Sequence, residues 1–275
     1  MKIRNTSTRR TVLTTGLASL AASIASTPAQ AARKAPGETK VVYFGGDYIH
    51  NGVGQERYLR ETFSKSGWDL LFAQASRFIT PVELADTDLL MMTRTGAFDA
   101  QGFSPDGLVR NRPDPDPFMP PEMEEVIIDN VTNRGMGFIA FHCTAGNPEH
   151  PRLMKFLGVK PLRTGAILQP VKIHDLNANH PITRGMEPFE IDLDENLRKE
   201  LEDDRNLIPL FTSTGVTDGS AAVGGWCVQR GKGRVVVLLA GHTNDPWKHA
   251  QYRQIHWRAA HWALGRDIPT FEMAR

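Results

Sequence analysis

The segment Gly135–Asn147, with the sequence GMGFIAFHCTAGN, constrains the fold of this chain more than any other stretch. Within it, Gly137–Phe141 is a short apolar run bounded by turn residues, which is typical of a strand buried on both faces of a parallel sheet. His142 and Cys143 follow directly, at the turn where this strand ends. Because ligands of open parallel sheets bind beyond the carboxyl ends of the strands, we expect the chemistry to lie near these two residues.

Apolar runs alternate with amphipathic segments over the first half of the chain, and this order is typical of a parallel α/β sheet. Glycine and proline punctuate the runs and set their ends. The expected strands are 40–44, 69–73, 88–93, 137–141, 167–173, 189–193, 206–211, 225–229 and 235–239, and the expected helices are 54–66, a short one starting at 81, 122–134, 148–157 and 246–264.

The first 31 residues are predicted to be an export signal rather than part of the fold. Arg9 and Arg10 lie in a twin-arginine pattern, an apolar stretch of small residues follows, and 29–31 forms an A-x-A cleavage site. The apolar stretch is too short to anchor the chain stably across a bilayer. The alternatives are a retained, lipid-free anchor and a disordered tail. We expect twin-arginine export to the periplasm or beyond, no membrane contact after cleavage, and one globular domain over 32–275.

The charge and the cysteine content exclude several classes of protein. The formal net charge is +1, and no basic stripe with interleaved aromatic residues occurs, so we expect no nucleic-acid partner. Cys143 and Cys227 are the two cysteines, too few for a disulfide scaffold in a domain of this size. An oxidising compartment would permit a disulfide between them, and two buried thiols are the alternative.

A proline-rich segment, 96–121, interrupts the alternation of strands and helices. It contains six prolines, and such a long loop in a compact domain is usually a lid, a binding loop or a surface insertion. Its residues do not decide between these alternatives.

Three histidines, His50, His142 and His242, each follow a predicted strand. If these strands are parallel neighbours, the three imidazoles meet at one edge of the sheet. Three histidines with an open position form a common catalytic metal site, especially for zinc, and such a metal polarises a carbonyl or activates water. The alternative is that some of them are hydrogen-bonded loop histidines. We expect a divalent metal such as zinc, and no nucleotide cofactor.

Three further side chains are candidates for catalysis. Cys143 would be a nucleophile if a base lay within reach and its pKa were lowered. Asp194 and Glu195 end a predicted strand, so either carboxylate could act as a base, a metal ligand or a residue that orients a ligand. A solvated acidic turn is the alternative for this pair.

Several segments together resemble the ThuA-like, or trehalose-utilisation, family over nearly the whole mature chain. The matching segments are Gly45–Asn51, Gly135–Cys143, His180–Gly185 (HPITRG), Asp194-Glu195, Gly231–His242 and Trp257–Gly265. The resemblance implies a variant of the class I glutamine amidotransferase fold, flavodoxin-like, with three layers, a mostly parallel central sheet and helices on both faces. In amidotransferases a cysteine stands at the strand-end elbow. Here His142 takes that position and His242 matches the later histidine, so ordinary glutaminase chemistry is not expected.

The family is associated with disaccharide breakdown alongside dehydrogenases that oxidise the sugar at C3, which implies a 3-keto glycoside as the substrate. A ketone at C3 acidifies the C2 proton, so a base can remove it before the C1 leaving group departs. The alternatives are a non-catalytic sugar-binding protein and a hydrolase that uses Cys143. The predicted roles are metal binding by His50, His142 and His242, catalysis by His142, Glu195, Asp194 and Cys143, and substrate binding by Gly46, Asp47, His180, Arg184 and Asn244.

Overall fold

The structure is a computed structural model that describes residues 37–47, 49–74, 78–94, 119, 121–146, 150–160 and 166–272. All of them belong to one unit, Ala31–Arg275. The predicted export signal and nearly all of the proline-rich segment lie outside the described residues, so their predictions stay untested. Within the described ranges, no helix is both long and apolar enough to cross a membrane.

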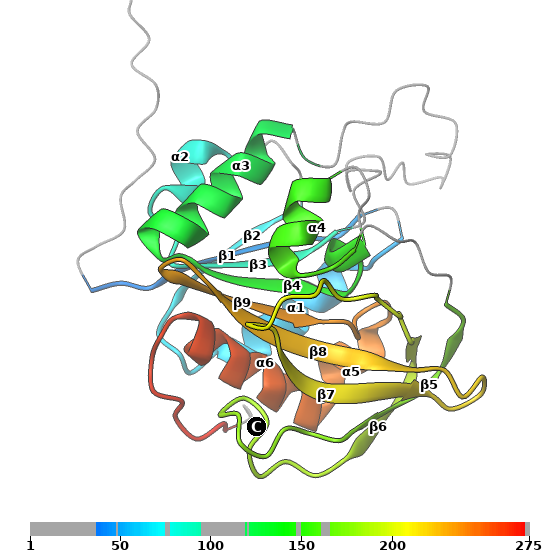
Figure 1. Cartoon of the computed structure of the whole chain (residues 1–275). Coiled ribbons are helices and arrows are strands. Elements are labelled where there is room, and N and C mark those ends of the chain that lie inside the picture. Colours follow the sequence, from blue (N-terminus) through cyan, green and yellow to red (C-terminus); the bar gives the residue numbers. More distant parts are fainter. Residues whose placement is uncertain are drawn as a thin grey trace, which may run out of the picture. The chain divides into compact units, whose positions relative to one another are not determined.

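A mixed sheet of nine strands, in the order β2-β1-β3-β4-β9-β8-β7-β5-β6, forms the framework (Figure 1). The strands are β1 Lys40–Gly45, β2 Asp69–Ala73, β3 Leu89–Thr93, β4 Gly137–Phe141, β5 Leu168–His174, β6 Phe189–Glu195, β7 Ile208–Gly215, β8 Ala221–Arg230 and β9 Gly233–Leu238. The helices are α1 Gly52–Phe63, α2 Pro81–Leu84, α3 Pro121–Asp129, the π-helix η4 Asn130–Arg134, the 3₁₀-helix η5 His142–Gly146, α4 Pro151–Leu157, α5 Asn244–Lys248 and α6 Ala250–Ala263.

The fold is α/β as predicted, but the prediction of a mostly parallel sheet is correct for only half of it. Four neighbouring pairs, from β2 to β9, are parallel, and the four pairs from β9 to β6 are antiparallel. Parallel neighbours need a long crossover, usually a helix, whereas antiparallel neighbours are joined by short turns. No helix lies between β5 and β9 in the described chain, and β8 and β9 form a hairpin.

Each face of the parallel half is covered by its own hydrophobic cluster. All five residues of β4 are buried. Ile139 and Phe141 of β4 join one cluster, together with side chains of α1 and α6, whereas Phe138 and Ala140 join the other, together with side chains of α3 and α4 (Figure 1). Because successive side chains of a strand point to opposite faces, a strand covered on both sides must be apolar throughout.

The closing helix, predicted as one element over 246–264, is interrupted at His249, whose extended backbone separates α5 from α6. The side chain of Thr243 caps α5 by accepting a hydrogen bond from the backbone N–H of Asp245. In α5, Trp247 Nε1 donates to the carbonyl oxygen of Gly241 at 3.1 Å. The short helix therefore braces the turn after β9 in which His242 lies.

The turn after β1 depends on a close approach of two glycines. A Cβ atom on Gly52 would lie 2.7 Å from the Cα atom of Gly46, and Gly46 itself has a φ of +80°. Only glycine accommodates both conditions without strain. The glycine-rich turn therefore lets α1 begin directly over the end of β1.

His256 of α6 is buried within an aromatic cluster and packs against the rings of Phe141, Trp247 and Tyr252. Its Nε2 atom has no hydrogen-bond partner among the described residues. Burial, with a smaller contribution from the charge of Arg253, lowers the pKa of His256 to about 3. The folded protein therefore holds this imidazole neutral at every pH above that value.

We predict that His256 makes the protein sensitive to acid. Because its pKa is lower in the folded chain than in the unfolded chain, the unfolded state takes up more protons as the pH falls below about 6.5. The free energy of unfolding should therefore fall by roughly 2–3 kcal/mol more between pH 7 and pH 4.5 in the wild type than in His256→Phe. Urea unfolding at both pH values measures this difference, and equal falls in the two proteins would contradict it.

Candidate functional site

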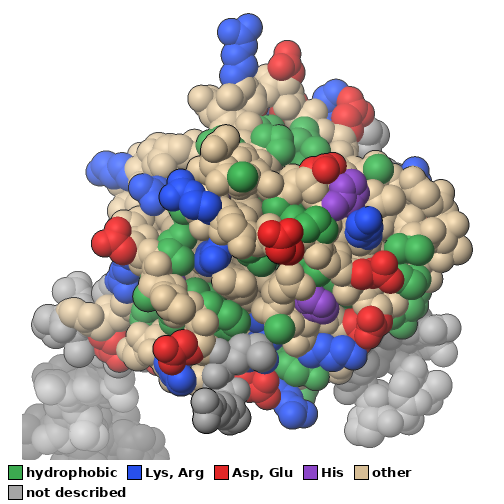
Figure 2. Space-filling model, turned by 90° about the horizontal axis from the view of Figure 1, so that it is seen from below, with side chains coloured by type: hydrophobic (Ala, Val, Ile, Leu, Met, Phe, Trp, Pro, Cys, Tyr) green, Lys and Arg blue, Asp and Glu red, His purple; other side chains and the backbone are tan. Residues whose placement is uncertain are grey.

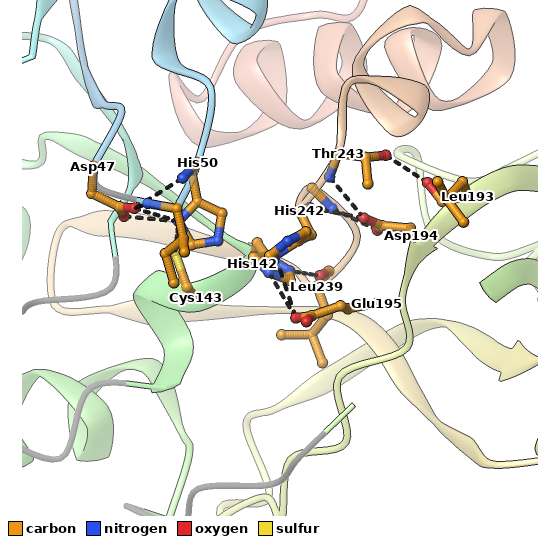
Figure 3. Close-up of polar contacts among 12 residues, drawn as sticks. Asp47, His50, His142, Cys143, Leu193, Asp194, Glu195, Leu239, His242 and Thr243 are labelled. Carbon is orange, nitrogen blue, oxygen red and sulfur yellow. Dashed lines mark hydrogen bonds and ion pairs between the residues drawn. The ribbon is translucent and has the colours of Figure 1, made fainter. Parts of the chain in front are cut away.

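The structure brings the three predicted metal ligands together at one edge of the sheet (Figure 3). His50 follows β1, His142 follows β4 and His242 follows β9. The ring centroids of the three imidazoles are 5.0–5.4 Å apart, and one nitrogen of each lies within 4.8 Å of a nitrogen of the other two. The parallel half of the sheet explains this convergence, because its strands all end at the same edge.

His50 is oriented by Asp47. Both carboxylate oxygens of Asp47 lie 2.7–2.8 Å from His50 Nδ1, and Oδ1 also accepts the backbone N–H groups of Ile49 and His50. Asp47 is completely buried and positions His50, whereas its role in substrate binding stays a prediction. His50 Nε2 consequently carries the lone pair, and it is buried without a hydrogen-bond partner in the described structure.

His142 stands at the sharp turn where β4 ends, with a φ of +45°. This left-handed conformation is uncommon for a residue other than glycine and is concentrated at functional sites. His142 Nδ1 donates a hydrogen bond to the carbonyl oxygen of Leu239 at 2.8 Å, which leaves Nε2 with a lone pair. The Nε2 atom lies 3.6 Å from Glu195 Oε2.

Asp194 holds the turn that carries His242. Its carboxylate accepts the backbone N–H groups of Gly241, His242 and Thr243 at 2.8–3.1 Å. Burial raises the pKa of Asp194 to about 6, against the opposing effects of His142 and these hydrogen bonds. The completely buried carboxylate of Asp194 therefore positions the His242 turn, and the predicted catalytic role of Asp194 stays a prediction.

The turn held by Asp194 leaves His242 available to a ligand. His242 Nδ1 is buried without a hydrogen-bond partner among the described residues, although it lies 3.4 Å from Glu195 Oε2. Burial lowers the pKa of His242, and the nearby His142 and His50 lower it further. These effects favour the neutral imidazole that metal ions bind.

Glu195 is the acidic residue that reaches the three histidines. Its Oε2 atom lies within 3.6 Å of nitrogens of both His142 and His242, and its side chain is 24% exposed. Burial by itself would raise the pKa of Glu195, but its interactions with His142, His242 and His50 lower it overall. Glu195 is therefore a carboxylate at neutral pH and can accept a proton.

The structure does not activate Cys143 as a nucleophile. Its Sγ atom lies 3.7 Å from His50 Nδ1, but this nitrogen is already bound by Asp47 and cannot also take the thiol proton. Burial and the Asp47 carboxylate raise the pKa of Cys143 well above its ordinary value, whereas a nucleophile needs a lowered one. Neither Cys143 nor Cys227 forms a disulfide.

Two of the predicted substrate-binding residues have contacts away from the histidine cluster. His180 packs against the ring of Trp262, and its Nε2 atom lies 3.4 Å from the sulfur of Cys227. Arg184 donates to the carbonyl oxygen of Asn179 within its own exposed loop. The described contacts of His180 and Arg184 therefore do not support a role in binding substrate. Their loop packs against α6, and the role of these two residues in substrate binding stays a prediction.

Two further predicted substrate-binding residues, Gly46 and Asn244, lie next to the cluster as Asp47 does. The carbonyl oxygen of Gly46 accepts a hydrogen bond from Arg94, and its backbone closes the turn that leads to His50. Asn244 begins α5 directly after the His242 turn, and its side chain packs against Gly54 of α1. Asn244 Oδ1 is buried without a hydrogen-bond partner in the described part of the chain. Its position remains compatible with the predicted role.

Sequence reasoning missed Arg94, which links three turns around the cluster. Its Nη1 atom donates to the carbonyl oxygens of Gly46 and Gln74 at 2.7 and 2.8 Å, and its backbone N–H donates to Thr144 Oγ1. Arg94 is completely buried. Arg94 directly follows an apolar strand, as the three histidines do, and this position could have identified it from the sequence.

The donor set fits a divalent metal ion. His50 Nε2 and His242 Nδ1 are buried nitrogens with no hydrogen-bond partner among the described residues, and His142 Nε2 carries a lone pair beside them. Asp47 and the Leu239 carbonyl support two of the imidazoles from behind, the arrangement commonly found around metal-binding histidines. Three neutral imidazoles suit zinc in particular.

The fold and the site define the class: an α/β protein with a polar histidine site beyond the carboxyl ends of its parallel strands. The chain matches the model of the ThuA family, described as trehalose utilisation, over residues 40–263. It belongs to that family. The predicted family is therefore confirmed.

Several solved structures share the fold. A putative ThuA-like protein from Bacteroides uniformis is 16% identical, with a TM-score of 0.59 over 84% of this chain and 92% of that chain. A cytoplasmic protein from Salmonella typhimurium is 12% identical, with a TM-score of 0.54 over 82% and 98%. A β-galactosidase from Bacillus circulans is 10% identical, with a TM-score of 0.53 over 84% of this chain and 32% of that chain. No curated protein matches the chain in sequence.

We predict that Asp47→Asn weakens zinc binding by about 10–100-fold, because the amide cannot hold His50 as the charged carboxylate does. Titration of the purified protein with zinc against a competing chelator measures the affinity. Asp192→Asn, which changes an exposed carboxylate on β6, is the matched control and should bind zinc as the wild type does. Unchanged affinity in Asp47→Asn would show that this carboxylate does not support a metal ligand.

Proposed function

We propose that the protein is a carbohydrate-processing enzyme that acts on an oxidised sugar, a 3-keto glycoside or disaccharide. Membership of the trehalose-utilisation family supports a carbohydrate-related role. The observation that carries the finer proposal is the Glu195 carboxylate, which lies 3.4–3.6 Å from two imidazoles of the histidine cluster. A carboxylate base beside a charge-stabilising cluster suits proton abstraction next to a ketone.

The proposed reaction is an elimination. Glu195 takes the proton from C2, which the neighbouring C3 ketone acidifies, and the electrons of that C–H bond form a double bond between C1 and C2. The bond from C1 to the leaving oxygen breaks, and this oxygen then takes a proton from solvent. A divalent metal held by His50, His142 and His242 would supply Lewis acidity that stabilises negative charge developing on the sugar ketone.

The chain's own residues prepare this chemistry before the sugar binds. Asp47 and the Leu239 carbonyl hold His50 and His142 with their site-facing nitrogens unprotonated. Asp194 holds the His242 turn through three backbone hydrogen bonds. Groups that are positioned in advance need no reorganisation during the reaction, which is a major source of rate enhancement.

Experiments distinguish this proposal from two alternative functions. A sugar-binding protein without catalytic activity would bind sugars but convert no 3-keto glycoside. A hydrolase that uses Cys143 would lose activity on alkylation of the thiol, and a chelator would have no effect. The raised pKa of Cys143 does not favour the hydrolase.

We predict different losses for His142→Ala and Glu195→Gln. His142→Ala should lose both the bound metal and turnover, because it removes a ligand from the cluster. Glu195→Gln should keep the metal but reduce turnover by at least about 100-fold, because the amide cannot accept the proton. Elemental analysis and chromatographic detection of the leaving group released from a 3-keto glycoside measure the two properties.

The opposite outcome for either variant would contradict one part of the proposal. An active, metal-free His142→Ala protein would remove the metal from the proposal, and wild-type turnover in Glu195→Gln would remove the base. Asp192→Asn serves as the control for a carboxylate lost from the exposed face of β6.

We also propose that residues 1–31 direct export of the folded protein by the twin-arginine route, as their sequence pattern indicates. Replacement of Arg9 and Arg10 by lysine should retain the protein in the cytoplasm at its full precursor length. Cell fractionation followed by mass determination measures location and cleavage. Export of the doubly substituted protein at an unchanged level would contradict the twin-arginine route.

A further inference from the structure

Two exposed leucines flank Glu195 on one face of the antiparallel ribbon formed by β5 and β6. Leu168 of β5 pairs directly with Glu195, and the next pair inward is Gln169 with Asp194. Paired side chains lie on the same face of a sheet, with Cβ atoms about 5 Å apart. Leu193 lies at a register shift of β6, between the pairs Gln169–Asp194 and Val171–Ile191. Because Leu193 is exposed and the next residue, Asp194, is buried, Leu193 lies on the same side of β6 as Glu195.

The burial of these side chains agrees with this assignment of faces. Gln169 and Asp194 are 2% and 0% exposed, because they point into the protein. Leu168 and Leu193 are 50% and 41% exposed, and the Glu195 side chain between them is 24% exposed. The candidate base therefore lies beside an apolar surface that water contacts.

Hydrogen bonds fix the ribbon in this orientation, so the leucines cannot turn into the core. The carbonyl oxygen of Leu193 accepts a hydrogen bond from Thr243 Oγ1 at 2.5 Å. The side chain of Gln169 accepts the backbone N–H groups of Thr217 and Asp218. A one-residue slip of β5 would turn Leu168 inward but expose Gln169, and a slip of β6 would turn Leu193 inward but expose Asp194.

Apolar surface also adjoins the histidine cluster at His50. Ile49, the residue directly before it, is 56% exposed, and its backbone N–H is held by Asp47. Binding pockets combine apolar contact surface with a few well-placed polar groups. Leu168, Leu193 and Ile49 supply apolar contact surface, and Glu195 and the histidines supply polar groups. A surface that bound only sugar hydroxyls would instead present hydrogen-bonding groups.

We propose that Leu168 and Leu193 bind an apolar leaving group, preferably an aromatic one, attached at C1 of the sugar. This assignment rests on the proposed function, because it places the leaving group relative to Glu195. The carbon that loses its proton to Glu195 adjoins the carbon that carries the leaving group, so the leaving group lies within reach of the residues that flank Glu195. A second sugar would present hydroxyl groups that leucine cannot hydrogen-bond. The substrate class is therefore aryl and other apolar glycosides rather than disaccharides.

The test compares the binding of two simple ligands to the full-length, zinc-loaded protein by calorimetry. The probes are 4-nitrophenyl glucoside and methyl glucoside, which differ only in the group at C1. The wild type should bind the nitrophenyl compound at least about 10-fold more tightly, a factor that corresponds to about 1.4 kcal/mol. The double variant Leu168→Ser/Leu193→Ser should reduce this preference to less than about 3-fold.

The matched control is Ile208→Ser. Ile208 is 41% exposed at the start of β7, whereas the start of β5, which carries Leu168, lies near the other end of β7. Its substitution should therefore leave the preference unchanged. Absence of a preference in the wild type, or its retention in the double variant, would overturn the proposal. A change from dimer to monomer in the double variant on sedimentation would also overturn it, because the leucines would then cover an interface between two copies.

Turnover is measured separately, with 3-keto derivatives of both glucosides. Conversion of the nitrophenyl derivative by the wild type, reduced in the double variant and unchanged in Ile208→Ser, supports the proposal and the function together. Absence of conversion with an intact binding preference would remove the elimination reaction but retain the apolar binding surface. The failure of the proposed function is thereby distinguished from the failure of this inference.

Discussion

Two buried carboxylates hold the candidate site together. Asp194 accepts three backbone N–H groups from the turn after β9, and Asp47 accepts two from the turn after β1 while it binds His50. Charge-assisted hydrogen bonds of this kind are strong, and a buried carboxylate that lost them would be costly. The turns that carry His50 and His242 are therefore held in one conformation by electrostatics as well as by packing.

The two halves of the mixed sheet contribute different parts of the site. The parallel half delivers His50, His142 and His242 at one edge, because its strands end together. The antiparallel half delivers Glu195 from β6, a strand at the far end of the sheet order. The hydrogen bonds from the β9 turn to Asp194 join the two halves and bring the neighbouring Glu195 to the histidines. The antiparallel half of the sheet therefore contributes a residue to the candidate site as well as extending the core.

The site also separates roles that lie side by side in the chain. Asp194 and Glu195 are consecutive, yet one is buried against the backbone and the other meets the imidazoles, because successive residues of a strand point to opposite faces. His142 and Cys143 are also consecutive, and only His142 presents a nitrogen to the cluster. The raised pKa of Cys143 and the engagement of His50 Nδ1 by Asp47 leave the thiol without a base.

The sequence was sufficient to predict the family, the elements of the parallel half and the positions of the three histidines, because apolar strands, glycine turns and their order along the chain are local signals. It did not determine the antiparallel half, the interruption at His249, or the roles of Asp47, Asp194 and Arg94. The pairing of β5 with β6 decides that Glu195, and not Asp194, faces the cluster. The same pairing places Leu168 beside Glu195. Only the tertiary structure decides such points, because register and facing follow from contacts between residues far apart in the chain, and a shift of one residue reverses every side chain.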